Sequence, residues 1–261
     1  MTRCVALALH MVRDMIRASL FAALAVSALA PACTSPEPTD ELGNETSADG
    51  EEGKGDAAGA FTFYNLIADN RACSLNSPSG CGTGFFVSRA NRSSTQCGRG
   101  PTQSQCKVTE LDWSGTAMPP SVAKGYEDGL GESQPLLVKG NVVPAANDAG
   151  LSFAVTEVWV ASTPEFVDGV FTLVHDNGLR CIRAPCPSLS ERRLNSNLAA
   201  ANISSLDFDG VDATQAEIDL AREQLYGPDG LVVVGYRDYD SAGGKVRTVN
   251  RFFTKAPVPL H

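Results

Sequence analysis

The strongest constraint on the fold is the similarity of the chain to itself at a shift of 95 residues. At this shift VTELDWSG (108–115) falls on ISSLDFDG (203–210), and LLVKG (136–140) falls on LVVVG (231–235). Self-similarity at a fixed spacing is typical of repeated structural units. We therefore predict an ancient tandem duplication within the chain.

The expected order of elements is the same in both halves, β-β-β-α-β-β. Alternation of apolar and polar residues predicts the strands. In the second half Thr214 and Glu217 form a capping-box pattern that opens a helix. We predict a strand-rich α+β fold with a first unit at 61–162 and a second at 163–258. Each unit is expected to be an OB-like barrel or an antiparallel sheet with one packed helix.

The N-terminus predicts export. Residues 1–32 combine a basic start, an apolar run of about 13 residues and small residues before a cut, which is typical of a signal peptide. The run is too short to span a bilayer as a helix. Ala30-Pro31-Ala32-Cys33 resembles a lipobox, so Cys33 is the predicted lipidation site. The alternative is ordinary cleavage at the same place, which releases a secreted protein.

Residues 33–60 have the composition of an acidic tether. They hold eight acidic residues and one lysine, and no aromatic residue. Such a segment buries too little apolar surface to offset the entropy of ordering it, so we expect disorder. The tether also supplies most of the net charge of −9, and the remainder is near neutral. This leaves no basic face for nucleic acid.

Six cysteines lie beyond the tether, and an even number in an exported chain favours disulfides over metal binding. They are Cys73, Cys81, Cys97, Cys106, Cys181 and Cys186. Local spacing favours the pairs Cys73–Cys81, Cys97–Cys106 and Cys181–Cys186, although the first two pairs can equally be crossed.

The stretch CIRAPCPS (181–188) is the most informative short segment. Its Cys-x4-Cys spacing with prolines does not match a redox pair, and a nucleophilic thiol would need a nearby base. A disulfide here closes a small rigid ring that displays Arg183, Ala184 and Pro185. The ring is either structural or a loop offered to a partner, such as a protease bound by an inhibitor.

Few residues outside this ring predict catalysis or metal binding. His175 is the only histidine expected in the folded part, at a strand end, and a solvated side chain is the simpler interpretation. The chain contains no G-x-S-x-G, Walker A, H-E-x-x-H or dinucleotide motif. The acidic DFDGVD (207–212) fails the EF-hand pattern, because Ala216 stands where that pattern needs Glu. We therefore predict no enzyme activity, cofactor or metal. An alternative is an enzyme that hydrolyses its substrate through His175 and a nearby acid.

Two segments carry a family resemblance. CGTGFFVSRANRSSTQC followed by CKVTELDW (81–113) resembles a cysteine-bearing domain of unknown function in predicted lipoproteins of myxobacteria and relatives. NGLRCIRAPCPSLSERRLN (177–195) is similar to a Cys-x4-Cys-Pro variant of that domain. The resemblance implies an exported, duplicated domain and no particular activity.

Together these features predict a lipid-anchored protein of the cell envelope with a binding or structural role. The expected location is the outer membrane, periplasmic or surface-facing, or else the medium if the chain is secreted. A protein partner is expected to contact the ring, and the alternative function is a secreted protease inhibitor that presents it. The sequence does not predict the oligomeric state.

Overall fold

The computed structural model describes residues 62–70, 82–131, 135–146, 150–165 and 167–256. The strands of the N-terminal half are β1 (Phe63–Ala68), β2 (Phe85–Arg89), β3 (Thr95–Gln96), β4 (Thr102–Gln103), β5 (Cys106–Val108), β6 (Glu110–Asp112), β7 (Leu136–Pro144) and β8 (Leu151–Ala161). Those of the C-terminal half are β9 (Val170–Asp176), β10 (Leu189–Arg193), β11 (Ala201–Ile203), β12 (Ser205–Asp207), β13 (Leu231–Tyr239) and β14 (Lys245–Lys255). The helices are η3 (Ser114–Thr116), α1 (Pro120–Gly131) and α2 (Gln215–Leu225).

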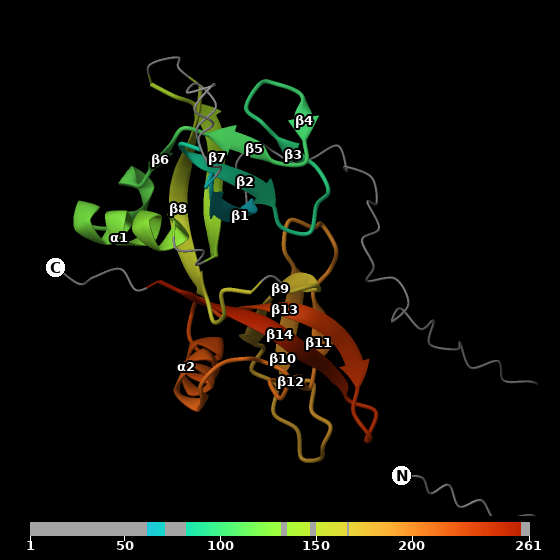
Figure 1. The fold of residues 1–261 in the computed structure, drawn as a ribbon. Helices are drawn as coiled ribbons and strands as arrows, with labels where there is room; N and C mark the ends of the chain where they lie inside the picture. The colour runs from blue at the N-terminus through green and yellow to red at the C-terminus, as the bar shows by residue number, and fades with distance from the viewer. Residues whose placement is uncertain (1–61, 71–81, 132–134, 147–149, 166, 257–261) are drawn as a thin grey trace, which may run out of the picture. The chain divides into compact units, whose positions relative to one another are not determined.

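Twelve of these strands form one sheet (Figure 1). Its main order is β11-β10-β9-β13-β14-β8-β7-β1-β2-β5, and neighbours along this path are antiparallel. Outside this path, β6 pairs with β8 and β12 pairs with β14, and both of these pairings are parallel. The remaining strands, β3 and β4, form a small separate hairpin.

The parallel pairings join strands that are far apart in the chain. In the C-terminal half, β11 pairs with β10 while β12, which follows it closely, pairs with β14. The segment 201–207 therefore connects one edge strand to the longest strand of that half. Glu191 of β10 accordingly contacts Arg237 of β13 and Arg247 of β14, although β10 pairs with neither of these strands.

Two glycines allow the long hairpins to bend. The register of β7 against β8 shifts between Lys139 and Gly140, and that of β13 against β14 shifts between Val234 and Gly235. A Cβ atom at either glycine would collide with a main-chain carbonyl oxygen of the neighbouring strand. Only glycine permits this close approach, which is usual where a bulge increases the local twist.

The helices agree with their sequence signals. The Thr214 hydroxyl accepts from the Glu217 amide at 3.3 Å, and the Thr214 amide donates to the Glu217 carboxylate at 2.7 Å, which confirms the capping box. Ala221 and Leu225 are buried, and α2 contacts β13 and β14. In the other half α1 begins at Pro120, as expected for a proline in the first turn.

Three apolar clusters hold the sheet together. The first lies mostly in the N-terminal half around Leu66 and also includes Ala256, and the second lies within the C-terminal half around Val233. The third draws on both halves and includes Phe63, Trp159 and Phe253. Phe63 and Trp159 meet edge to face, with their ring centroids 6.3 Å apart.

Asn91 adds polar contacts to this shared cluster. Its side-chain amide donates to the Phe171 carbonyl at 2.8 Å, and its carbonyl oxygen accepts from the Phe171 amide at 2.8 Å. Asn91 adopts a φ of 59°, a left-handed conformation that Asn tolerates better than most residues. Such pairing satisfies main-chain groups at a strand start, where they would otherwise be buried without partners.

The predicted fold class is wrong. We expected an α+β tandem duplication of two β-β-β-α-β-β units, each an OB-like barrel or an antiparallel sheet with one helix. Instead, β14 pairs with β8 through residues 253–255 and 159–161, and the two halves share one sheet of 12 strands. Only two α-helices accompany it among the described residues. A local repeat pattern carries no information about strand pairing between halves, which explains the error. The boundary at residue 162 stays a prediction.

Candidate functional site

The ring predicted from the sequence is present in the loop between β9 and β10. Cys181 and Cys186 form a disulfide with their Cα atoms 5.5 Å apart. A second disulfide joins Cys97 and Cys106. Both pairings are those that local spacing favoured. Cys33, Cys73 and Cys81 lie outside the described residues.

Hydrogen bonds brace the base of this loop. The Asn177 amide donates to the Ser188 carbonyl at 3.0 Å, and the Asn177 side chain donates to the Pro187 carbonyl at 2.8 Å. Arg180 donates through both terminal nitrogens to the two Asp176 carboxylate oxygens, at 2.9 and 2.7 Å. The Arg180 guanidinium is the main reason why the pKa of Asp176 is lowered, and the Gly178 amide adds to it. These contacts hold the two ends of the loop together in addition to the disulfide.

The tip of the loop is exposed. Residues 178–184 are all solvent-exposed, and Ile182 is 103% exposed. Arg183 and Ala184 follow it, and Pro185 is half-buried close to Gly244 in the turn between β13 and β14. An aliphatic side chain held away from every core residue gains nothing from folding, because its apolar surface stays in water. The geometry therefore displays Ile182 and Arg183 together on a closed ring.

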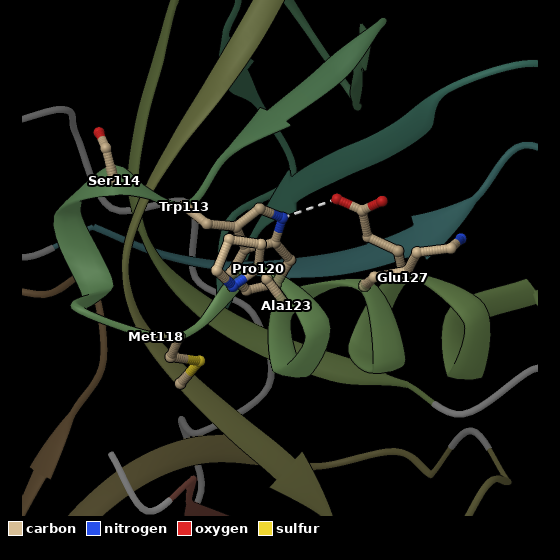
Figure 2. Close-up of a pocket in the computed structure, with 7 residues that line it drawn as sticks. Trp113, Ser114, Met118, Pro120, Ala123 and Glu127 are labelled. Carbon is tan, nitrogen blue, oxygen red and sulfur yellow. Dashed lines mark hydrogen bonds between the residues drawn. The ribbon is translucent and has the colours of Figure 1, made fainter. Parts of the chain in front are cut away.

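A cavity of about 290 Å³ lies beside α1, at a distance from this ring in the chain. Figure 2 shows the indole nitrogen of Trp113 pointing toward the carboxylate of Glu127, which lies on α1 one turn after Ala123. The Trp113 indole N–H donates to Glu127 Oε1 at 2.7 Å. In the sequence Trp113 stands within the repeated stretch VTELDWSG (108–115) and at the end of the segment that resembles a known family, and neither pattern predicted this cavity.

His175 packs against the main chain at the start of a neighbouring strand. It lies at the end of β9, half-buried, with its ring against the main chain at Gly230. Burial lowers the pKa of His175, Arg192 lowers it further, and Asp229 opposes both. Among the hydrogen bonds of the described residues none joins the His175 ring to a serine, cysteine or carboxylate.

The acidic segment 207–212 forms a turn. Asp207 Oδ1 accepts from the Asp209 amide at 2.9 Å, the usual geometry of an Asp-stabilised turn. In the part of the chain that the structure describes, no three histidine, cysteine or acidic residues gather in a way that would hold a metal ion.

A buried ionic cluster links β10 to β13 and β14, and no sequence pattern predicted it. Glu191 on β10 accepts from Arg237 Nε at 2.6 Å and from Arg247 Nε at 2.7 Å. Arg247 also donates to the Gly235 carbonyl at 2.9 Å. Glu191 and Arg247 are almost fully buried. The sequence shows only that residues 237 and 247 are basic. That they meet Glu191 can be predicted only when the strand topology is known.

Comparison with known proteins places the chain in a family. Residues 62–255 match the domain of unknown function DUF6748, and the chain belongs to this family. No curated protein and no solved structure matches the chain significantly. Among the described residues no helix is long and apolar enough to cross a membrane.

Proposed function

We propose that this protein is exported, anchored to the cell envelope through a lipid on Cys33, and binds a protein partner through the ring 181–186. The signal-like residues 1–32 and the lipobox-like stretch before Cys33 support export and anchoring. The family resemblance to predicted myxobacterial lipoproteins points the same way. The two disulfides of the described residues are in keeping with an oxidising compartment.

The observation that carries the binding role is the full exposure of Ile182 on a ring closed by a disulfide. A rigid loop loses little conformational entropy when it binds, so its contacts are retained as affinity. Ile182 supplies apolar area and Arg183 supplies five hydrogen-bond donors and a charge. Together they form a small contact surface suited to a protein partner with an apolar pocket beside a carboxylate.

The test uses the full chain in its native envelope. A photoreactive benzoylphenylalanine replaces Ile182 in one strain and Leu220, an exposed residue of α2, in a matched control strain. We expect irradiation to produce a discrete adduct from position 182, reduced by Arg183→Ala, and none from position 220. Equal adducts from both positions, or none from 182, would contradict a ring-specific partner.

Anchoring is tested separately. Metabolic labelling with an alkyne fatty acid is expected to mark the wild-type chain and leave Cys33→Ala unlabelled. The variant is also expected to leave the membrane fraction. An unlabelled wild-type chain in the medium would instead support ordinary cleavage and secretion.

A second function, protease inhibition, is favoured by the position of Arg183 on the braced ring. Trypsin-like proteases bind an extended basic residue in an acidic pocket, and a preorganised loop is a typical inhibitor device. Micromolar protein is then expected to slow hydrolysis of an arginine anilide by trypsin. Arg183→Ala should remove the effect, and Arg192→Ala, an exposed arginine of β10, should retain it. Unchanged trypsin activity with the wild-type chain would exclude this function.

A further inference from the structure

We propose that the cavity beside α1 is a binding site for a small organic ammonium cation. Its walls come from Trp113, Ser114 and Met118 before the helix, and from helix residues that include Ala123 and Glu127 (Figure 2). A cavity of about 290 Å³ is near the lower end of the range for small-molecule sites. This site is independent of the ring 181–186.

The indole of Trp113 is held in one orientation. Its N–H donates to Glu127 Oε1 at 2.7 Å, and its ring stacks on Tyr126 with centroids 6.3 Å apart and an interplanar angle of 23°. Burial within this pair raises the pKa of Tyr126, so its hydroxyl stays neutral. A half-exposed indole fixed by two contacts offers a preorganised aromatic surface, and Trp is the best aromatic partner for a cation.

The charge of the cavity favours a cation. Glu127 places a carboxylate in the wall, and Met118, Pro120 and Ala123 supply apolar surface. Lys124 also lines the cavity, but its ammonium pairs with Asp128 at 2.9 Å. The Glu127 carboxylate, in contrast, accepts from the neutral indole N–H of Trp113 and keeps its negative charge. An anionic ligand would be repelled there, whereas an ammonium gains from both the carboxylate and the indole.

The other half of the molecule places its own cation at the corresponding point. Phe208 directly follows β12, as Trp113 directly follows β6, and a helix follows each of them. The Arg222 guanidinium of α2 lies over the Phe208 ring, 5.6 Å from its centroid. In the N-terminal half the helix contributes Glu127 beside Trp113 instead of a cation. A ligand cation would complete there the aromatic–cation contact that Arg222 makes within the chain.

The test compares two molecules of the same shape. Choline and its neutral isostere 3,3-dimethylbutan-1-ol are titrated into the full chain up to about 20 mM, a range that detects millimolar binding. The change in tryptophan fluorescence on adding ligand reports on Trp113, because Trp113 lines the cavity and the second tryptophan, Trp159, is buried in another cluster. Saturation-transfer NMR of the ligand methyl groups supplies a readout that does not depend on tryptophan.

We expect a saturable response to choline and none to the neutral isostere. Glu127→Gln should weaken choline binding by about tenfold, since one ionic partner is lost. Glu223→Gln, the same change at an exposed position of α2 outside the cavity, should leave it unchanged. Equal responses to both molecules, or no response to choline in either readout with wild-type protein, would overturn the proposal whatever the variants do.

Discussion

Asn195 pairs with both main-chain groups of Phe63, which lies 132 positions earlier in the chain. Its carbonyl oxygen accepts from the Phe63 amide at 2.8 Å, and its side-chain amide donates to the Phe63 carbonyl at 2.7 Å. The same amide donates to the Ala90 carbonyl at 2.9 Å. Asn195 thus binds the main chain at the start of β1, as Asn91 binds it near the start of β9. Each half therefore holds the start of a strand of the other half.

Asn195→Ala should destabilise the protein markedly. Removing the amide takes a partner from the Phe63 N–H and from the Ala90 carbonyl, whereas the Phe63 carbonyl keeps the Ala90 N–H at 3.0 Å, so the cost is about 2 kcal/mol in total. The free energy of unfolding is measured by urea denaturation, followed through the buried Trp159, which shares a cluster with Phe63. The matched control is Asn197→Ala at an exposed position of the same loop, which should stay within about 0.5 kcal/mol of wild type. Equal midpoints for the two variants would show that the Asn195 contacts do not stabilise the fold.

Glu191→Gln should be among the most damaging single changes. It removes the buried negative charge that both Arg237 and Arg247 contact, and breaking a buried ion pair by removing one partner costs about 3–5 kcal/mol. The control is Asp219→Asn, which breaks an exposed pair with Arg222 and should cost less than about 1 kcal/mol. Thermal unfolding monitored by circular dichroism compares both variants. Similar melting temperatures for the two would contradict a role of Glu191 in stability.

Local features were predictable from the sequence, because they depend on neighbouring residues. The capping box of Thr214 and Glu217 opens α2, and DSAGGK (240–245) forms the turn between β13 and β14, with Gly243 at a φ of 80°. Each signal acts within a few residues through a hydrogen bond or a backbone preference. Cys181 and Cys186 also pair as their short separation favoured.

Long-range features were not predictable from the sequence, because they depend on residues that are far apart in the chain. Asn195 reads as an ordinary turn residue, and Glu191 reads as a solvated charge on a strand. Their roles depend on β8 pairing with β14 and on β12 pairing in parallel with β14, which no local pattern encodes. The cavity at Trp113 likewise requires the helix to fold back beside the strand end. The prediction of two separate units from the repeat was wrong for the same reason, because it did not include the pairing of β8 with β14.

The two disulfides should differ in their contribution to stability. Their sequence separations are 9 and 5, so loop closure alone contributes about 2–3 kcal/mol to each and hardly distinguishes them. Burial distinguishes the two disulfides, because Cys97 and Cys106 lie in the core of the N-terminal half, whereas Cys181 is exposed. Replacing Cys97 and Cys106 by Ala should therefore lower the urea midpoint more than replacing Cys181 and Cys186. The reverse order would show that the ring stabilises the fold beyond its own loop.

The last prediction concerns pH. Burial is the main cause that lowers the pKa of His175 in the folded state, with Arg192 acting in the same direction and Asp229 against it. The unfolded chain, with an ordinary histidine pKa of about 6.5, then binds more protons than the folded chain as pH falls through that value. Stability should therefore be full above about pH 6.5 and decrease toward the lower folded pKa.

His175→Gln should flatten this dependence, because His175 is the one histidine among the described residues. The measurement is the free energy of unfolding at several pH values between about 7.5 and 5, where carboxyl groups with ordinary pKa values near 4 stay ionised. Asp176, whose pKa is lowered by Arg180, acts only below that range. A parallel slope in wild type and variant, or a wild-type protein that gains stability on acidification, would show that the ring of His175 is not desolvated by folding.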